Sequence, residues 1–302
     1  MVNTPVLWFS EPGALDRARA GGKGASLAQL TQWGLPVPAG FVVPADALRA
    51  ILEGCGALAE ARRRAAEGQL REHAVAEAVA DELQARVREA ALPTDLRQAI
   101  AGAYRALTTR SGPTARVAVR SSATAEDSAA ASFAGQQDSF LDVEHDAGVL
   151  EKVQACAASL FTARALAYRA RKDAWADLGM SVVVQAMVEA RAAGIMFTRD
   201  PVQRRERVVV EAVPGSGEAL ASGEAVPDHY ELDRQTRAVV ARFAPPRPSP
   251  VLTDPELAEL VGLGLRTEQL FGSPQDIEWA IGRAGESDER LYLLQSRPIT
   301  TL

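Results

Sequence analysis

The sequence lacks an excess of basic residues, and this shortage argues against whole classes of ligand. Its 302 residues include 33 Lys and Arg against 39 Asp and Glu, for a formal net charge of -6. Proteins that bind nucleic acid or anionic membranes in a general way need a positive field to neutralise phosphates. We therefore expect no nucleic-acid partner and no membrane partner, although a few local cations can still hold a small anionic ligand.

Cysteine, long apolar runs and a targeting segment are also scarce or missing. The two cysteines, Cys55 and Cys156, stand in Ala-rich helical contexts without a CxxC spacing, which favours buried reduced thiols over a metal site or a disulfide. No stretch approaches the ~18 apolar residues of a membrane helix, and no basic region followed by an apolar one opens the chain. The sequence predicts a soluble cytoplasmic protein, and its 47% hydrophobic content is enough for one or two domains.

Two familiar nucleotide-binding fingerprints are incomplete. The string AGGKGAS is not a Walker A loop, because Gly24 follows Lys23 where that motif needs Ser or Thr, and EAVPGSGEALASG does not complete a dinucleotide fingerprint. The glycines would still let the chain approach a nucleotide while Lys23 reaches a phosphate as a point charge, whereas a solvated lysine is the alternative. We predict a loop centred on Ala20 to Ser26, then a helix that runs to Trp33 and stops at Gly34.

The run VAVRSSATAEDSAAASFAGQQDSFLDV is the most informative part of the chain. Val117 and Val119 alternate with Ala118 and Arg120, which predicts a strand that delivers Arg120 at its end. Small residues and hydroxyls then fill positions 121 to 137. Gly135 can adopt a positive φ, and successive N–H groups there could form an anion-binding nest. The segment therefore suits a polyphosphate, with a mobile surface loop as the alternative.

A predicted hairpin near the C-terminal end gathers oxygen ligands and an arginine. DIEWAI and LYLLQSRP are separated by the polar stretch 282 to 289, which indicates two antiparallel strands. Asp276 and Glu278 share one face of the first strand, and Gln295 and Arg297 share one face of the second. If these faces coincide, the oxygens suit a hard cation such as Mg²⁺ and the arginine suits a phosphate. A structural cross-strand salt bridge of Arg297 is the alternative.

The remaining pattern predicts two lobes. Residues 45 to 110 carry Ala, Leu, Arg and Glu at helical spacing, which indicates an all-helical insertion, and a second helical stretch covers about 147 to 178. The strand 180 to 188 is almost entirely apolar, as in a sheet covered on both faces. Short strands follow it, and this change near Val188 is our candidate boundary.

Taken in order, the motifs resemble one family. GGKGASLAQL, the run from 117 to 143, VVVQAMV, GIMFTRDPV, GSGEALASGEAVPDHYELDR and DIEWAI with LLQSRPIT resemble the ATP-binding domain shared by phosphoenolpyruvate synthase, pyruvate phosphate dikinase and rifampicin phosphotransferase. The resemblance covers nearly the whole chain. It implies an α/β (α+β) fold similar to ATP-grasp, with an ATP cleft between two lobes. The lobes would be 1 to 187, including the insertion, and 188 to 302, with the metal-binding hairpin.

The resemblance also implies roles for particular residues. Lys23 and Arg120 would contact the phosphates of ATP, and Arg297 would stabilise the transferred charge, so these three are the candidate catalytic residues. The cofactors implied are ATP and Mg²⁺. The other ligand positions follow as a set: Gly135 and Ser139 in the phosphate loop, Gln185 and the backbone of Met187 and Val188 at the adenine, and Glu278 and Gln295 at Mg²⁺ and phosphate, with Asp276 as a possible second carboxylate. The family often has threonine at the position of Ser139, and GLGE where this chain has GSGE.

Members of the family form AMP and phosphate through a histidine on a separate swivelling domain. The histidines of this chain, His73, His145 and His229, lack the Gly-rich, Ser/Thr-preceded setting of that carrier. The resemblance thus implies an ATP-dependent phosphotransferase domain that needs a phosphohistidine-bearing domain or protein as its partner. The alternatives are a non-catalytic ATP-binding regulatory module, an ATP-grasp ligase and a direct small-molecule kinase.

Overall fold

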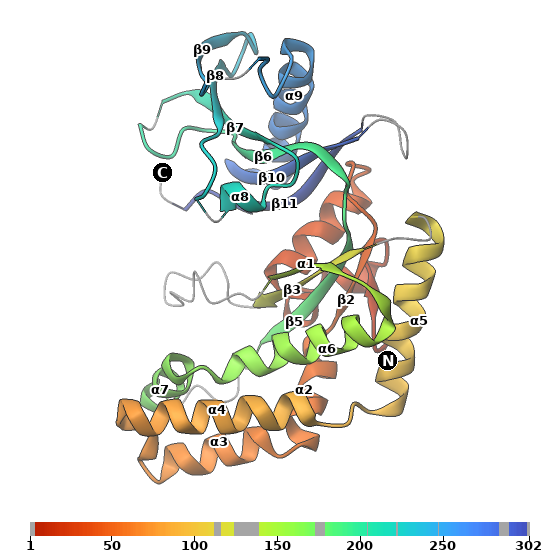
Figure 1. Ribbon diagram of the computed structural model, residues 1–302, viewed down its shortest axis with the longest axis vertical. Coiled ribbons are helices and arrows are strands. Elements are labelled where there is room, and N and C mark those ends of the chain that lie inside the picture. The colour runs from red at the N-terminus through yellow and green to blue at the C-terminus, as the bar shows by residue number, and fades with distance from the viewer. Residues whose placement is uncertain are drawn as a thin grey trace. The chain divides into compact units, whose positions relative to one another are not determined.

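A computed structural model describes residues 4–111, 116–123, 139–172, 179–203, 205–221, 223–246, 248–283 and 290–300. The chain divides into two compact units (Figure 1). Unit 1 comprises Met1–Ala28 and Ala39–Met187, and unit 2 comprises Gln29–Pro38 and Val188–Leu302. Each unit contains one antiparallel sheet with helices, so the predicted α+β class is confirmed. Unit 2 also includes the short segment Gln29–Pro38 from the N-terminal part of the chain. The predicted division at a single point, into 1 to 187 and 188 to 302, leaves this segment in the first lobe.

The sheet of unit 1 has the most apolar strand of the chain at its centre. Its order is β1-β2-β5-β3-β4, and every neighbouring pair is antiparallel. The strands are β1 (Leu7–Trp8), β2 (Gly40–Val43), β5 (Met180–Ala186), β3 (Val117–Ala123) and β4 (Ser139–Val143). All seven residues of β5 are buried, in agreement with its nearly continuous apolar sequence.

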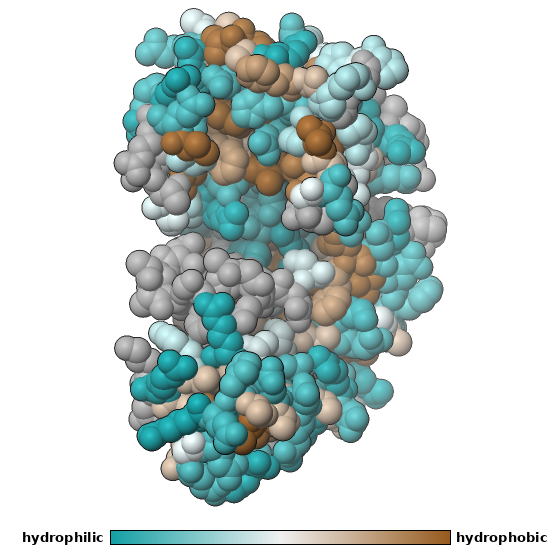
Figure 2. Space-filling model, turned by 60° about the vertical axis from the view of Figure 1, so that its left-hand side comes forward, coloured by the Kyte–Doolittle hydropathy of each residue, from teal (hydrophilic) through white to brown (hydrophobic). Residues whose placement is uncertain are grey.

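Helices of unit 1 cover one face of this sheet. Val117, Val119, Val182 and Val184 belong to the same core cluster as the buried side chains of these helices. The helices are α2 (Ala45–Gly54), α3 (Ala57–Ala66), η2 (Gln69–Arg71), α4 (His73–Glu89), α5 (Thr94–Ser111), α6 (His145–Ala158), η3 (Ser159–Phe161) and α7 (Ala163–Lys172). They include the region where the sequence predicts a helical insertion, and α3 lies alongside α4 (Figure 1). Figure 2 shows mainly hydrophilic side chains on the outer surface of these helices.

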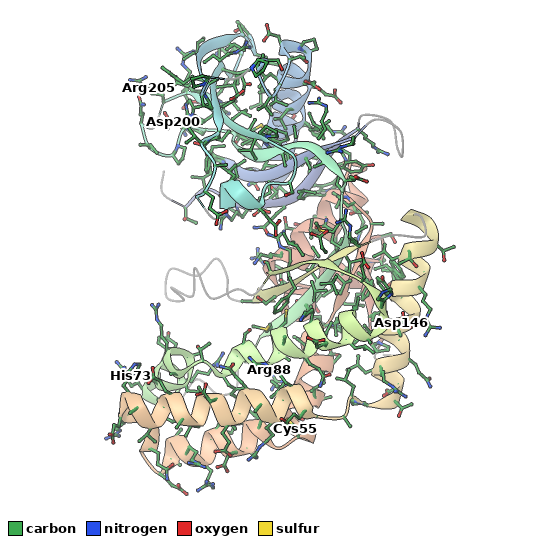
Figure 3. The ribbon with its side chains drawn as sticks, viewed as in Figure 1. Cys55, His73, Arg88, Asp146, Asp200 and Arg205 are labelled. Atoms are coloured by element: carbon green, nitrogen blue, oxygen red, sulfur yellow. The ribbon has the colours of Figure 1, made fainter. Side chains whose placement is uncertain are left out.

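Both cysteines lie in this helical part of unit 1, and both are free thiols. Cys156 in α6 is fully buried in the core cluster. Cys55 follows α2, where it is partly buried and its Sγ lies 3.6 Å from the Leu52 carbonyl oxygen (Figure 3). The burial that the sequence predicts is therefore complete at Cys156 and partial at Cys55.

The opposite face of the same sheet carries α1 (Arg17–Gln32), which follows the short helix η1 (Pro12–Leu15). Gly24 of α1 packs against this face, since a Cβ on it would lie 2.9 Å from Val42 and 3.6 Å from Val183. The predicted loop from Ala20 to Ser26 is wrong. These residues are helical, with a kink at Gly21 (φ 69°, ψ 177°) that only glycine adopts readily. The helix ends at Gln32, close to the predicted stop at Gly34.

The sheet of unit 2 has the order β11-β10-β6-β7-β8-β9, again antiparallel throughout. Its elements are β6 (Ala190–Phe197), β7 (Arg207–Pro214), α8 (Glu218–Ala221), β8 (Asp228–Asp233), β9 (Val239–Phe243), α9 (Asp254–Phe271), β10 (Gln275–Gly282) and β11 (Leu291–Pro298). Tyr230, Ile277 and Trp279 are fully buried in a core that α9 helps to form. Leu30 from the end of α1 joins this core.

Local sequence signals set both ends of α9. Thr253 and Glu256 form a capping box, and Pro255 occupies the first turn, where its missing N–H costs nothing. Gly272 ends the helix in the left-handed conformation with φ 73°. The buried side chains of α9 then face the sheet. No helix among the described residues combines the length and the apolar character that a bilayer span needs.

Candidate functional site

Arg120, Ser139 and Gln185 share one face of the sheet in unit 1. Arg120 on β3 lies directly opposite Ser139 on β4 and opposite Val183 on β5, and Gln185 lies two residues beyond Val183. Side chains directly opposite each other in a sheet point to the same side, as do side chains two residues apart on one strand. This is the face on which α1 packs. The expectation that Arg120 ends its strand is wrong, because β3 continues to Ala123.

Lys23 lies at the kinked part of α1, against the same face. Only 8% of the residue is exposed, and its Nζ donates to the Ser121 carbonyl oxygen at 3.2 Å. The backbone N–H groups of Lys23 and Gly24 donate to Ser122 Oγ at 3.1 and 3.3 Å. A freely solvated lysine is therefore wrong for this position. The sequence assigned Ser121 and Ser122 to a loop, whereas both are fully buried in β3.

Of the other residues predicted to contact the phosphates or the adenine, Met187 and Val188 are described by the structure and Gly135 is not. Gly135, together with the centre of the predicted phosphate loop, lies outside the described residues. Met187 donates its backbone N–H to the Arg116 carbonyl oxygen at 2.8 Å and is the last residue of its segment of unit 1. Val188 begins the second segment of unit 2. Both side chains are partly buried.

In unit 2 the hairpin of β10 and β11 brings the predicted metal and phosphate residues to one face. Glu278 lies directly opposite Gln295, and Asp276 lies directly opposite Arg297. A register shift follows Glu278, after which Trp279 pairs with Leu293. The alternate residues of β10 point into the core, where Ile277 and Trp279 are fully buried. The polar face and the apolar face are therefore those that the alternation in the sequence predicts.

An ion pair lies at one end of this polar face. Nε and Nη2 of Arg297 both lie 2.8 Å from Asp276 Oδ2, and 62% of the arginine side chain is exposed against 12% of the aspartate. Burial raises the pKa of Asp276, the positive charge of Arg297 opposes this rise, and the negative charge of Glu278 adds to it. Arg297 thus has the cross-strand pairing that was the structural alternative, and most of its side chain remains accessible.

Two amide side chains have buried atoms that make no hydrogen bond within the described part of the chain. They are Nε2 of Gln185 in unit 1 and Oε1 of Gln295 in unit 2, and the two residues are only 3% and 5% exposed. An unsatisfied buried polar atom costs about 1 to 3 kcal/mol, so such atoms are rare without a ligand or water. The donor set at Gln295 is an amide oxygen beside carboxylates, which fits a hard cation such as Mg²⁺.

The acidic residues on this face do not form a complete protein cage for a metal. Among the described residues there is no group of three or more His, Cys, Asp or Glu side chains placed to hold an ion. Mg²⁺ commonly takes only one or two carboxylates and completes its shell with phosphate and water. Glu278, Asp276 and Gln295 are therefore compatible with Mg²⁺ held together with a nucleotide, and they do not fit a metal held by protein alone.

The three histidines differ in setting. His73 begins α4 (Figure 3), and His145 begins α6. Both side chains are exposed, and both residues lie in unit 1. His229 lies on β8, where it pairs with Glu211 of β7, and its Nδ1 is 3.7 Å from Glu211 Oε1. Each of them is adjacent to an acidic side chain. That none of them is the family's carrier histidine stays a prediction.

Comparison with known proteins identifies the family. A family model described as "pyruvate phosphate dikinase, AMP/ATP-binding domain" matches residues 17–247 and 243–302. The chain is 39% identical to a probable phosphoenolpyruvate synthase of Methanothermobacter thermautotrophicus, over 98% of this chain and 46% of that protein. It is 42% identical to a rifampicin phosphotransferase of a Streptomyces species, over 98% of this chain and 36% of that protein. The chain spans less than half the length of these relatives, and it belongs to the family of pyruvate phosphate dikinase AMP/ATP-binding domains.

Proposed function

We propose that this chain binds Mg-ATP and activates it for transfer of a phosphoryl or pyrophosphoryl group to a histidine on a separate domain or partner protein. The overall products would be AMP, inorganic phosphate and the phosphohistidine, formed from ATP, water and the histidine. The observation that carries the proposal is the register of the β10–β11 hairpin, with Glu278 opposite Gln295 and Asp276 opposite Arg297. An ion pair alone would explain Asp276 and Arg297, but not the buried Gln295 oxygen.

The residues of unit 1 would hold the nucleotide. Lys23 and Arg120 supply positive charge for the phosphates, and Ser139 adds a hydroxyl donor on the same sheet face as Arg120. The buried Gln185 amide offers a donor that still lacks an acceptor, which suits recognition of a base edge. Met187 and Val188 would contribute backbone groups to the same base, and Gly135 would belong to the phosphate loop.

The residues of unit 2 would hold the metal and the transferred charge. Glu278 and Gln295 provide oxygen ligands, and Asp276 is a possible second carboxylate. Bound Mg²⁺ would neutralise the phosphate charge that develops during transfer. Arg297, with 62% of its side chain accessible, can leave part of its charge available to a phosphate while it orients Asp276.

The need for a partner rests on what the relatives share. The chain has similar identity, 39% and 42%, to relatives whose names give different products or acceptors. What this chain contributes should therefore be the step common to both, which is the use of ATP. Transfer to an acceptor requires the nucleophile to be held within about 3 to 3.5 Å of the reacting atom, and we assign that task to a partner carrying a histidine.

The test uses the chain together with the part of the Methanothermobacter relative that lies outside the matched region, supplied as a separate polypeptide, because the family resemblance implies that this part carries the histidine. With Mg-ATP, we expect acid-labile phosphate on the added domain and an equal amount of AMP. Two controls omit Mg²⁺ or replace the carrier histidine by Ala. A chain that binds no Mg-ATP in calorimetry while folded would refute the proposal outright.

The nucleotide product separates the remaining functions. AMP formation only in the presence of the histidine domain supports the hypothesis of a phosphotransferase. ADP formation that depends on an added amine and carboxylate would indicate a ligase, and rapid phosphorylation of a small molecule without any partner would indicate a direct kinase. Binding of Mg-ATP without turnover under all these conditions would indicate a regulatory module.

A further inference from the structure

Two buried serines meet beneath the kink of α1, and neither has a role in the site described so far. Ser122 on β3 lies directly opposite Ser181 on β5, and both residues are 0% exposed. Their side chains point to the face of the sheet that carries Arg120, two residues before Ser122 on the same strand. Buried hydroxyls need hydrogen-bond partners, and here the partners are backbone groups of α1.

Ser122 Oγ makes three of these contacts. It accepts the N–H groups of Lys23 and Gly24 and donates to the Ala20 carbonyl oxygen at 3.2 Å. Ser181 Oγ donates to the same carbonyl oxygen at 2.5 Å and lies 3.3 Å from the Ser122 carbonyl oxygen. The two hydroxyls therefore bind the backbone on both sides of Gly21, which is where the helix is kinked.

The close packing at Gly21 makes this arrangement specific. A Cβ at Gly21 would lie 2.2 Å from Ser122 Oγ, 2.4 Å from the Ser122 carbonyl oxygen and 2.8 Å from Ser181 Oγ. The left-handed conformation and the close contact both require glycine. The chain thus approaches the sheet as closely as it can at the residue that lies two positions before Lys23.

We infer that Ser122 and Ser181 are positioning residues that direct the Lys23 ammonium group toward the phosphates of the nucleotide. Ser122 fixes the Lys23 backbone, and the neighbouring Ser121 carbonyl oxygen accepts from Lys23 Nζ at 3.2 Å. One short segment of β3 therefore holds both ends of the lysine, while Arg120 on the same strand supplies the second cation. The inference rests on the proposed binding of ATP.

The experiment is a double-mutant cycle of Ser122→Ala with Lys23→Met, with the dissociation constants for Mg-ATP and adenosine measured by calorimetry. Losing a hydrogen bond between a charged group and its partner typically weakens binding by about 10- to 100-fold, so we expect Ser122→Ala, which displaces Lys23, to weaken Mg-ATP binding by about that factor. Adenosine has no phosphates, and its binding should change less than twofold. In the Lys23→Met background, Ser122→Ala should have little further effect on ATP, because the group that it positions is gone.

Ser181→Ala is the second variant, since it leaves all three Ser122 contacts in place and should fold even if Ser122→Ala does not. We expect it to weaken Mg-ATP binding by a smaller factor, again only when Lys23 is present. Thr162→Ala is the matched control in unit 1, because Thr162 Oγ1 also accepts a backbone N–H, that of Ala165 at 3.2 Å. It should leave both dissociation constants unchanged.

The possible outcomes separate this inference from the proposed function. Equal losses for ATP and adenosine, or additive losses in the cycle, would show a general structural role and overturn the inference alone. Ser181→Ala with unchanged ATP binding, in the case that Ser122→Ala is unfolded, would overturn it as well. If the unmodified folded chain binds no Mg-ATP, the proposed function fails and the inference falls with it.

Discussion

Replacing Glu278 by Gln separates a metal-binding role of this side chain from a structural one, because the two roles predict opposite effects on stability. Asp276 and Glu278 are two residues apart on the same face of β10, so their carboxylates lie about 7 Å apart. The two negative charges repel each other, in agreement with the raised pKa of Asp276, for which burial is the main cause and Glu278 a further one. The neutral amide is nearly isosteric and removes this repulsion.

The expected magnitudes follow from this geometry. Two unit charges about 7 Å apart interact by about 2 kcal/mol at an effective dielectric constant near 20, and solvent on this partly exposed face lowers the value. Without ligand, Glu278→Gln should therefore increase the free energy of unfolding, or lower it by less than about 1 kcal/mol. The unmodified chain should gain about 2.7 kcal/mol from Mg-ATP at 100 times its dissociation constant, and the variant should lose most of this gain.

The assay is thermal unfolding of both proteins with and without ATP, across a series of Mg²⁺ concentrations. A gain of about 2.7 kcal/mol corresponds to a rise in melting temperature of roughly 5 to 11 °C for a domain of ~150 to 250 residues. Glu259→Gln on the exposed side of α9 is the matched control, since it removes the same charge from the same unit and should keep the full shift. Asp276→Asn shows whether the neighbouring carboxylate is the stronger ligand.

Two results would refute this reasoning. A Glu278→Gln variant that retains the full Mg²⁺-dependent shift would remove Glu278 from the metal site. A variant that is destabilised by 2 kcal/mol or more without any ligand would show that Glu278 supports the fold. If Asp276→Asn alone abolished the shift, the metal would belong to Asp276 instead.

Three further predictions concern the phosphate cations, an ion pair in unit 2 and the kink of α1. Arg120→Ala and Arg297→Ala should each lower AMP formation with the partner domain about 10²- to 10³-fold, and an unchanged rate would exclude that residue. Burial tends to raise the pKa of Glu268, but hydrogen bonds from Arg234 outweigh it and lower this pKa. Glu268→Gln should therefore reduce the free energy of unfolding by about 1 to 3 kcal/mol near neutral pH. Because this pKa is depressed in the folded state, the difference in denaturant unfolding should shrink as the pH falls below the ordinary value of 4.5, and a constant difference would contradict it. Gly21→Ala should lower the free energy of unfolding by about 2 to 5 kcal/mol, because it adds backbone strain and overpacks the contact with Ser122. Gly34→Ala is the control, since Gly34 has a similar φ of 71° and open space around it, and it should lower the free energy of unfolding by only about 1 to 2 kcal/mol. Equal losses would mean that packing against Ser122 contributes nothing.

The hairpin of unit 2 could be predicted from the sequence because the pattern that specifies it lies within two strands that are close together in the chain. Alternation with a period of two assigns Ile277 and Trp279 to the core and Glu278 to the other face, and a slip of one residue would bury the charges. The pairing partner is also close in sequence, so few registers are available. The fully apolar β5 could be predicted for the same reason, because a central strand buried on both faces needs no polar side.

The surroundings of Lys23 could not be predicted, because they depend on contacts between distant parts of the chain. Ser122 is 99 residues from Lys23, and serine is favoured in turns and loops because its hydroxyl bonds to nearby backbone groups. The sequence does not show that backbone groups of α1 bond to Ser122, so Ser121 and Ser122 predict a loop and Arg120 is expected at the end of its strand. The glycines of AGGKGAS likewise suggested a loop, whereas only Gly21 departs from the helix.

Two of the buried polar atoms that make no hydrogen bond within the described residues belong to amides that the motifs select, while others, such as Trp279 Nε1 in the core of unit 2, do not. Natural sequences satisfy their buried polar groups, and the places where they do not are expected at functional sites. Gln185 and Gln295 are almost completely buried, yet one amide nitrogen and one amide oxygen make no hydrogen bond within the described residues. A leucine or methionine of similar volume would stabilise either position without ATP. Under the proposed function, a base edge would supply an acceptor to Gln185 and Mg²⁺ would supply a cation to Gln295, which would satisfy both buried atoms.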